Sequence, residues 1–175
     1  MQDAQRYDPV ARLLHWLTVL LIVLQFSIAW TMPEIHRGVE PTGLIGWHLS
    51  VGVAILAVVL VRIGWRVTHS EPAAPTSLSP VLQAISRITH FALYGLLVAL
   101  PFLGWANASA RGWAVMLFGT IPLPQLVAKG SALGQQMGDV HQTAALVLLA
   151  SIALHVLGAM YHLLVVKDRT VQRML

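Results

Sequence analysis

The sequence predicts an all-α membrane protein, a bundle of four transmembrane helices in a single domain. Hydrophobic residues make up 57% of its 175 residues and charged residues only 10%, whereas soluble domains contain about 25% charged residues. Four apolar segments each come close to the ~20 residues that cross a bilayer about 30 Å thick. They cover residues 13–30, 44–67, 88–106 and 140–166.

A polar stretch precedes the first apolar segment. Residues 1–12 contain Asp3 and Asp8, and no apolar run in them leads to a small-residue cleavage site. We therefore expect no cleaved signal peptide. The segment 13–30 is expected to stay in the membrane as a helix.

The connectors between the segments differ in character. Residues 69–80 are rich in Pro, Ser and Ala, which is typical of an exposed link. Residues 107–138 are apolar but are interrupted by Gly119, Pro122 and Pro124, so this connector is too broken to span the membrane. We expect it to lie on the membrane surface or to cap the bundle.

Basic residues lie at the ends of the apolar segments, where they indicate topology. The net charge of +4 does not follow one helix face, so it does not indicate nucleic-acid binding. Eight Lys and Arg residues lie on the predicted side of the two termini, and three lie on the opposite side. Because cytoplasmic loops carry the excess of positive charge, this count places both termini in the cytoplasm. The eight are Arg6, Arg12, Arg62, Arg66, Arg87, Lys167, Arg169 and Arg173, and the three are Arg37, Arg111 and Lys129.

The absence of cysteine narrows the chemistry of the chain. Without cysteine there are no disulfides, iron–sulfur clusters, thiolate nucleophiles or covalently attached c-type haems. A metal must rely on the eight histidines, the six methionines or the seven acidic residues.

Four histidines fall at two depths of the predicted bundle. In the fourth segment His141 and His155 are 14 residues apart, so they lie on nearly one helix face and about 21 Å apart along the axis. With the topology above, His15 lies at the level of His155, and His48 at the level of His141. Two pairs of imidazoles at two depths are the ligand sets that two stacked b-type haems need.

Two axial imidazoles on one haem iron determine which reactions the iron can carry out. They leave no open position on the metal, so the iron can only exchange electrons. Ionisable residues inside a membrane are costly and mark functional sites. His15 and His48, near the interfaces, are also typical of interfacial anchors. His90, near the cytoplasmic end of the third segment, either competes with His15 or hydrogen-bonds a haem propionate.

Small residues accompany these histidines. They favour either the close approach of a flat macrocycle or ordinary helix–helix packing. They are Gly43, Gly46, Ser50 and Gly52 around His48, and Ala144, Ala145, Ala150 and Ser151 in the fourth segment.

The chain resembles the bacterial cytochrome b561 family in ordered blocks that cover nearly its whole length: RYDPVARLLHWL, GWHLSVGV, THFALYGLLVALPFLGW, VHQTAALVLLASIALHVLGAMYH and KDRTVQRML. It is also similar to the cytochrome b subunits of membrane hydrogenases and formate dehydrogenases. In those relatives the first- and fourth-helix histidines bind the cytoplasmic-side haem, and the second- and fourth-helix histidines bind the outer haem. The resemblance therefore implies His15 with His155 and His48 with His141.

The resemblance also implies a quinone, ubiquinone, near the cytoplasmic haem in a bacterial inner membrane. His162, two turns beyond His155, is a candidate to hydrogen-bond a quinone oxygen or a propionate; the alternative is a snorkelling interfacial histidine. Superoxide oxidation at the outer side is a known activity within the family. Arg111 and Lys129 are candidates to attract that anion.

Three functions are compatible with these residues. The first is a dihaem, quinone-linked oxidoreductase that takes electrons from a small outer donor, with superoxide as one candidate. The second is a haem-binding anchor subunit that passes electrons from a soluble partner such as a dehydrogenase or hydrogenase. The third, a transporter or structural bundle, predicts no haem absorbance. The separate chain and its compact connectors favour the first.

Overall fold

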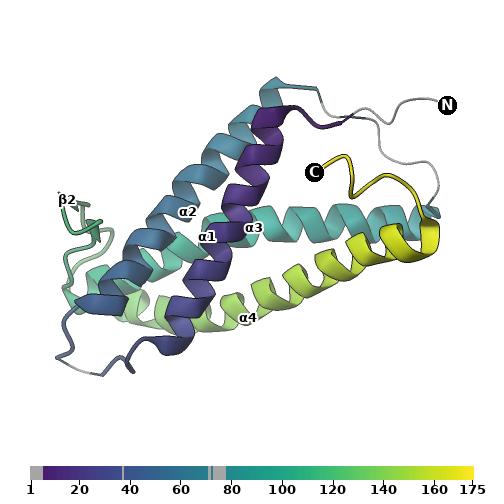
Figure 1. Cartoon of the computed structure of the whole chain (residues 1–175). Coiled ribbons are helices and arrows are strands. Elements are labelled where there is room, and N and C mark those ends of the chain that lie inside the picture. The colour runs from purple at the N-terminus through teal and green to yellow at the C-terminus, as the bar shows by residue number, and fades with distance from the viewer. Residues whose placement is uncertain (1–5, 37, 71, 73–77) are drawn as a thin grey trace.

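Four long helices dominate the structure, a computed structural model that describes residues 6–36, 38–70, 72 and 78–175 (Figure 1). Each is long and apolar enough to cross a membrane, which confirms the predicted all-α, four-helix membrane fold. A π-helical turn, η1, continues the last helix. The bounds are α1 Pro9–Thr31, α2 Gly43–Thr68, α3 Pro80–Arg111, α4 Ala132–Tyr161 and η1 His162–Val166.

Capping residues start α1 and α3 earlier than hydrophobicity predicts. The Asp8 carboxylate accepts two backbone N–H bonds from the first turn of α1, at 2.9 and 3.0 Å. Pro9 follows at the first helical position, where the missing N–H costs nothing. Ser79 and Pro80 repeat this arrangement in α3. As a result α1 begins four residues before the predicted segment and α3 begins eight residues before it.

The connector predicted over residues 107–138 is shorter in the structure, because helix enters it from both sides. α3 continues to Arg111, and α4 begins at Ala132. The Ser131 hydroxyl caps α4 by accepting the backbone N–H of Gly134 at 3.3 Å. Most residues in the first two turns of α4 are polar or small, so hydropathy does not reveal these turns. Within the predicted connector, only residues 112–131 lie outside helices.

A small hairpin in this connector packs on the end of α2. Its strands, β1 Met116–Leu117 and β2 Ile121–Pro122, pair antiparallel. The hydroxyl of Ser50, on α2, donates to the Met116 carbonyl at 3.0 Å and accepts the Phe118 N–H at 3.1 Å. The connector thus occupies a capping position at one end of the bundle (Figure 1), one of the two positions that the sequence predicts.

The helices form two antiparallel pairs that cross. α1 packs on α2, α3 packs on α4, and α2 joins the pairs through α3. Within the described part of the chain, the backbone of α1 does not pack against that of α3 or α4. Toward the end that holds both termini the pairs diverge (Figure 1). The core at the crossing contains Ile28, Val51, Ile55, Val59, Leu97, Leu100 and Leu148.

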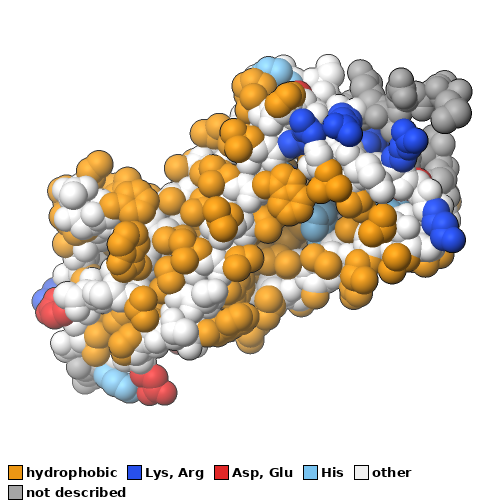
Figure 2. Space-filling model, viewed as in Figure 1, with side chains coloured by type: hydrophobic (Ala, Val, Ile, Leu, Met, Phe, Trp, Pro, Cys, Tyr) orange, Lys and Arg blue, Asp and Glu red, His pale blue; other side chains and the backbone are white. Residues whose placement is uncertain are grey.

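Most of the visible surface is apolar, and Lys and Arg side chains gather mainly at the end where the C-terminal tail lies (Figure 2). Such a surface is unfavourable in water but is solvated by lipid chains in a bilayer. Two predictions lie outside the described residues in whole or in part. They concern Arg37 and the connector over 69–80, of which residues 71 and 73–77 are not described.

Residues 167–175, which we call the C-terminal tail, fold back onto the start of α1. The Trp16 indole N–H donates to the Met174 carbonyl at 2.9 Å. The Tyr7 backbone N–H donates to the Arg173 carbonyl at 3.1 Å. The tail therefore ties the end of α4 to α1, although these two helices do not pack directly.

Candidate functional site

His15 of α1 and His155 of α4 face each other where the helix pairs diverge. Their ring centres are 6.3 Å apart, and the ring planes make an angle of 68°. The Arg62 guanidinium, on α2, places Nη2 3.1 Å from His15 Nδ1. Because the backbones of α1 and α4 do not pack together, the interval between these helices is bridged by side chains.

His48 of α2 and His141 of α4 form a second opposed pair, with ring centres 6.2 Å apart and planes at 72°. His141 Nδ1 lies 2.9 Å from the Leu100 carbonyl of α3. A carbonyl can only accept, so Nδ1 carries the proton and Nε2 holds the lone pair that a metal needs. Gly104 makes room for the ring: a Cβ there would lie 3.1 Å from His141 Cε1.

Gln25 of α1 reaches across to His48. Its side-chain amide donates to the His48 carbonyl at 3.1 Å and lies 3.2 Å from His48 Nε2. His48 Nδ1 is buried and has no hydrogen-bond partner among the described residues. A buried polar atom without a partner is costly in apolar surroundings. The imidazole thus retains an unsatisfied nitrogen that a ligand would satisfy.

A third histidine stands beside the His15–His155 pair. The His90 ring, on α3, is 5.0 Å from the His155 ring, with planes at 84°. Its Nδ1 lies 2.7 Å from the Ser86 carbonyl and therefore donates to it. The structure thus brings three of the predicted histidines together at one level and two at the other.

The spacing within each opposed pair fits a metal between the rings. A metal–imidazole bond is about 2 Å long and the nitrogen lies about 1 Å from the ring centre, so two axial imidazoles have centres about 6 Å apart. The observed 6.3 and 6.2 Å match this spacing, whereas the 5.0 Å from His90 to His155 is shorter. Imidazole nitrogens are common axial ligands of haem iron, so each pair fits one haem. Among the described residues, no group of three or more His, Asp or Glu is placed to hold a metal ion.

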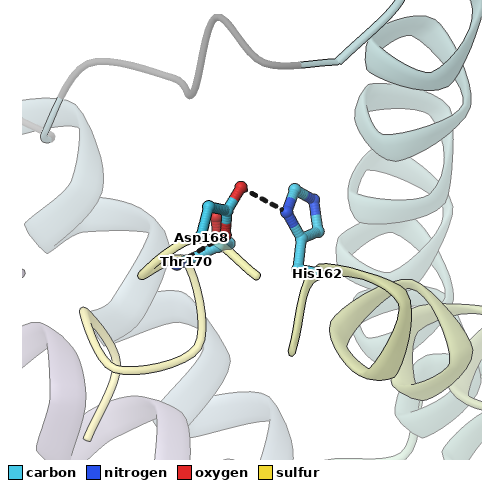
Figure 3. Close-up of polar contacts among 3 residues, drawn as sticks. All are labelled: His162, Asp168 and Thr170. Carbon is cyan, nitrogen blue, oxygen red and sulfur yellow. Dashed lines mark hydrogen bonds and ion pairs between the residues drawn. The ribbon is translucent and has the colours of Figure 1, made fainter. Parts of the chain in front are cut away.

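His162 opens η1 and is held by an acidic residue of the C-terminal tail. Its Nδ1 lies 2.8 Å from Asp168 Oδ2, and Asp168 Oδ1 accepts the Thr170 N–H at 2.9 Å (Figure 3). Burial acts to raise the pKa of Asp168, but hydrogen bonds from Thr170 and His162 outweigh it and hold this pKa below its ordinary value of 3.8. The ring of His162 is therefore oriented by Asp168.

Arg111 and Lys129 meet at the carboxyl end of α3. Arg111 Nε donates to Asn107 Oδ1 at 3.0 Å, and its guanidinium lies 5.4 Å from the centre of the Trp113 ring. The Lys129 side chain lies against Gly112, where a Cβ would approach its Cδ to 2.7 Å. Cations at a helix C-terminus stabilise the helix, so both residues also have a structural role there.

Two of the small residues around His48, Gly46 and Gly52, lie close to other parts of the chain. A Cβ at Gly46 would lie 2.8 Å from the Pro41 carbonyl oxygen, and a Cβ at Gly52 would lie 3.4 Å from Gln25 Nε2. These approaches show close packing at Gly46, and room for a macrocycle beside the small residues stays a prediction.

The residues that contact the histidines include several that were not predicted as part of the site, among them Gln25, Arg62, Gly104 and Asp168. Gln25 and Arg62 had a usable signal, since each is a polar residue inside an apolar segment, where such residues are costly. Gly104 and Asp168 had none, because their roles depend on contacts that local sequence does not indicate.

Comparison with known proteins shows the family to which the chain belongs. The family described as Prokaryotic cytochrome b561 matches residues 6–175. The chain is 32% identical over 166 residues to the probable superoxide oxidase CybB of Yersinia pestis, covering 93% of this chain and 91% of that protein. It is 28% identical over 178 residues to cytochrome b561 homolog 2 of Escherichia coli strain K12, covering 98% and 92%. It is also 28% identical over 180 residues to cytochrome b562 of Cereibacter sphaeroides, covering 100% and 98%.

The family match and the four apolar helices both indicate a membrane cytochrome. The chain belongs to the prokaryotic cytochrome b561 family, and it is a multi-pass bacterial membrane protein that binds b-type haem and transfers electrons.

Proposed function

We propose that this protein is a dihaem oxidoreductase that moves electrons between a donor at the outer face of the membrane and a quinone at the cytoplasmic face. The observation that carries the proposal is an opposed imidazole pair at each of two levels, with ring centres 6.3 and 6.2 Å apart. One helix, α4, supplies a histidine to each pair. The two centres therefore share one rigid support.

His15 and His155 are the proposed ligands of an inner haem, and His48 and His141 those of an outer haem. These imidazoles would hold each haem, and a haem held by two imidazoles would supply a one-electron couple. The surrounding protein orients the rings. The bond from His141 to the Leu100 carbonyl, which leaves Nε2 for the metal, is the best-defined example.

His90 is proposed as a neighbour of the inner haem rather than an axial ligand. Its ring is closer to His155 than two axial ligands of one metal would be, and its Nδ1 is engaged by the Ser86 carbonyl. In this arrangement the other ring nitrogen of His90 would hydrogen-bond a haem propionate. His15, with the fitting separation, is the better partner for His155.

The quinone, which we take to be ubiquinone, is proposed to bind near His162. Reduction of a quinone to a quinol takes up two electrons and two protons. A histidine that is oriented by a carboxylate can transfer a proton and have its charge stabilised by that carboxylate. His162 and Asp168, 2.8 Å apart at the end of α4, are so arranged. Asp168, in the C-terminal tail, connects this pair to the aqueous side.

Superoxide is the proposed donor at the outer face. Two superoxide anions each lose one electron and become O₂, while the quinone takes the two electrons and two protons. Arg111 and Lys129 supply positive charge that would attract this anion. Asn107, which binds Arg111, also donates to the carbonyls of Gly134 and Gln135 in the first turn of α4. These cations therefore lie at the end of the bundle that holds His48 and His141.

The same proposal places the single domain in the bacterial inner membrane with both termini in the cytoplasm. The support is the excess of Lys and Arg on the side of the two termini. In this orientation, the connector over residues 112–131 lies on the outer side of the inner membrane. The His162–Asp168 pair then faces the compartment that supplies the protons.

The reaction is tested with purified protein in liposomes that contain ubiquinone, with superoxide generated outside. We expect one quinol for every two superoxide anions consumed, and no quinol when superoxide dismutase is added or His155→Ala protein is used. No quinol under any superoxide flux would contradict the proposal. If quinol then formed only after a soluble dehydrogenase was supplied, the protein would instead be a haem-binding anchor subunit.

A further inference from the structure

Arg62 places a cation against the proposed inner haem ligand. Its Nη2 lies 3.1 Å from His15 Nδ1, and its guanidinium lies 5.3 Å from the centre of the Tyr94 ring. These partners come from α1 and α3, so the guanidinium is held between two helices that flank α2. Arg62 also lies inside the apolar span of α2, where a charge is costly and marks function.

We propose that Arg62 raises the redox potential of the inner haem by placing a fixed positive charge beside His15, which favours the reduced form. This inference rests on the proposed function, because it takes His15 as an axial ligand. Reduction adds one electron, so the net charge of the site falls by one. A fixed positive charge next to the ligand favours that change, and it does so more strongly in an apolar interior, where screening is weak.

Other charged and titratable groups face the same region. The ring of His155 lies 6.3 Å from that of His15, and the ring of His90 lies 5.0 Å from that of His155. Arg66, one turn further along α2, places its guanidinium 5.6 Å from the centre of the Tyr94 ring. Arg62 is the arginine whose guanidinium contacts His15, so the two arginines make a matched pair for experiment.

The position of Arg62 suits electron transfer from the outer face to the inner face. An electron moving inward moves against a membrane potential that is negative inside. A raised potential at the inner haem offsets this cost, because the electron then moves to a stronger acceptor. Arg62 therefore acts through the position of its charge next to His15, and it need not touch donor or quinone.

A redox titration of the purified haem protein, followed by its visible spectrum, tests the inference. The inner centre is identified as the one missing from His155→Ala protein. We expect that, at a fixed ambient potential, Arg62→Gln lowers the reduced-to-oxidised ratio of the inner haem about tenfold, equivalent to about 59 mV for one electron. The outer haem should be unchanged. Arg62→Lys, which keeps the charge, should restore most of the ratio.

Arg66→Gln is the matched control, and it should leave the inner haem close to its native potential. An unchanged inner ratio in Arg62→Gln protein that retains both haems would overturn the inference. If Arg62→Gln protein does not retain the inner haem, Arg62→Lys decides: a native ratio supports the inference and a fallen ratio contradicts it. One haem or none in the native protein would refute the proposed function. Two haems, with an inner-haem ratio that does not change when Arg62 is replaced, would refute only this inference.

Discussion

At the scale of single residues, the site depends on how each imidazole is held. His141 has the most complete set of contacts, with its Nδ1 on the Leu100 carbonyl and its ring against Gly104. Its position in an apolar helix could be read from the sequence. Its hydrogen-bond partner could not, because that partner is a backbone carbonyl of another helix.

Gly104→Leu tests the need for space beside His141. A Cβ at this position would lie 3.1 Å from Cε1 and 3.2 Å from Nδ1 of the ring, so a larger side chain must displace the imidazole. We expect loss of the outer haem with the inner haem retained, measured by haem content and the visible spectrum. Gly95→Leu on the same helix is the control, because nothing lies within 4 Å of its Cβ position. Equal haem loss from both variants would count against this role for Gly104.

Asp8 predicts a pH dependence of stability. The Ala11 backbone N–H holds the pKa of Asp8 below its ordinary value of 3.8; burial opposes this, and the Trp65 indole N–H, 3.1 Å away, adds to it. Because the pKa is lower in the folded state, Asp8 stabilises the fold above pH 3.8. This contribution is lost as pH falls through the folded-state pKa.

We therefore expect the thermal unfolding midpoint to fall as pH is lowered below 3.8, and to fall less steeply in Asp8→Asn protein. Asparagine also caps helices well but does not titrate. The measurement is thermal unfolding in detergent at stepped pH. Parallel pH curves for the two proteins would show that Asp8 does not contribute in this way.

At the scale of the elements, helix interiors and both ends of α2 were predictable, but the starts of α1, α3 and α4 were not. Hydropathy located all four helices, since each must be apolar to cross a bilayer. The ends are set by Asp8, Ser79 and Ser131, which lie outside the apolar segments and act through hydrogen bonds to the first turn. The error was largest at the starts of α3 and α4, each of which begins eight residues before the predicted segment.

The C-terminal tail is an element whose fold-back could not be predicted from its polar sequence. Deleting residues 172–175 removes the carbonyls that accept the N–H groups of Tyr7 and Trp16. We expect faster amide hydrogen exchange at Tyr7, because its backbone N–H becomes open to water. Trp16→Phe is the control, since it removes only the indole bond and should leave the Tyr7 amide protected. Unchanged exchange at Tyr7 after the deletion would mean that the tail does not hold the start of α1.

At the scale of the whole molecule, topology links sequence to site. Alternating helix directions and the 14-residue spacing in α4 fix the histidine levels, and for this reason the pairing of His15 with His155 and of His48 with His141 could be predicted. The structure brings both pairs together, and haem ligation by them stays a prediction. The crossing of the helix pairs, which places Arg62 and Gly104 beside these rings, depends on packing that no local pattern indicates.

Orientation in the membrane is testable with single cysteines, because the native chain has none. Thr120→Cys lies in the hairpin connector and Gln172→Cys in the C-terminal tail, both at exposed positions. We expect a membrane-impermeant maleimide to label Thr120→Cys in spheroplasts, and to label Gln172→Cys only after the membrane is opened. The reverse pattern would invert the assignment of inner and outer haems.

The central claim is that two haems are held by two histidine pairs, and haem quantitation on purified protein tests it most directly. We predict two b-type haems per native chain and one in each single variant. His15→Ala and His155→Ala should lose the same spectral component, and His48→Ala and His141→Ala the other. One haem or none in the native protein would contradict the claim. Loss of the inner component in His90→Ala but not in His15→Ala would contradict the inner pairing.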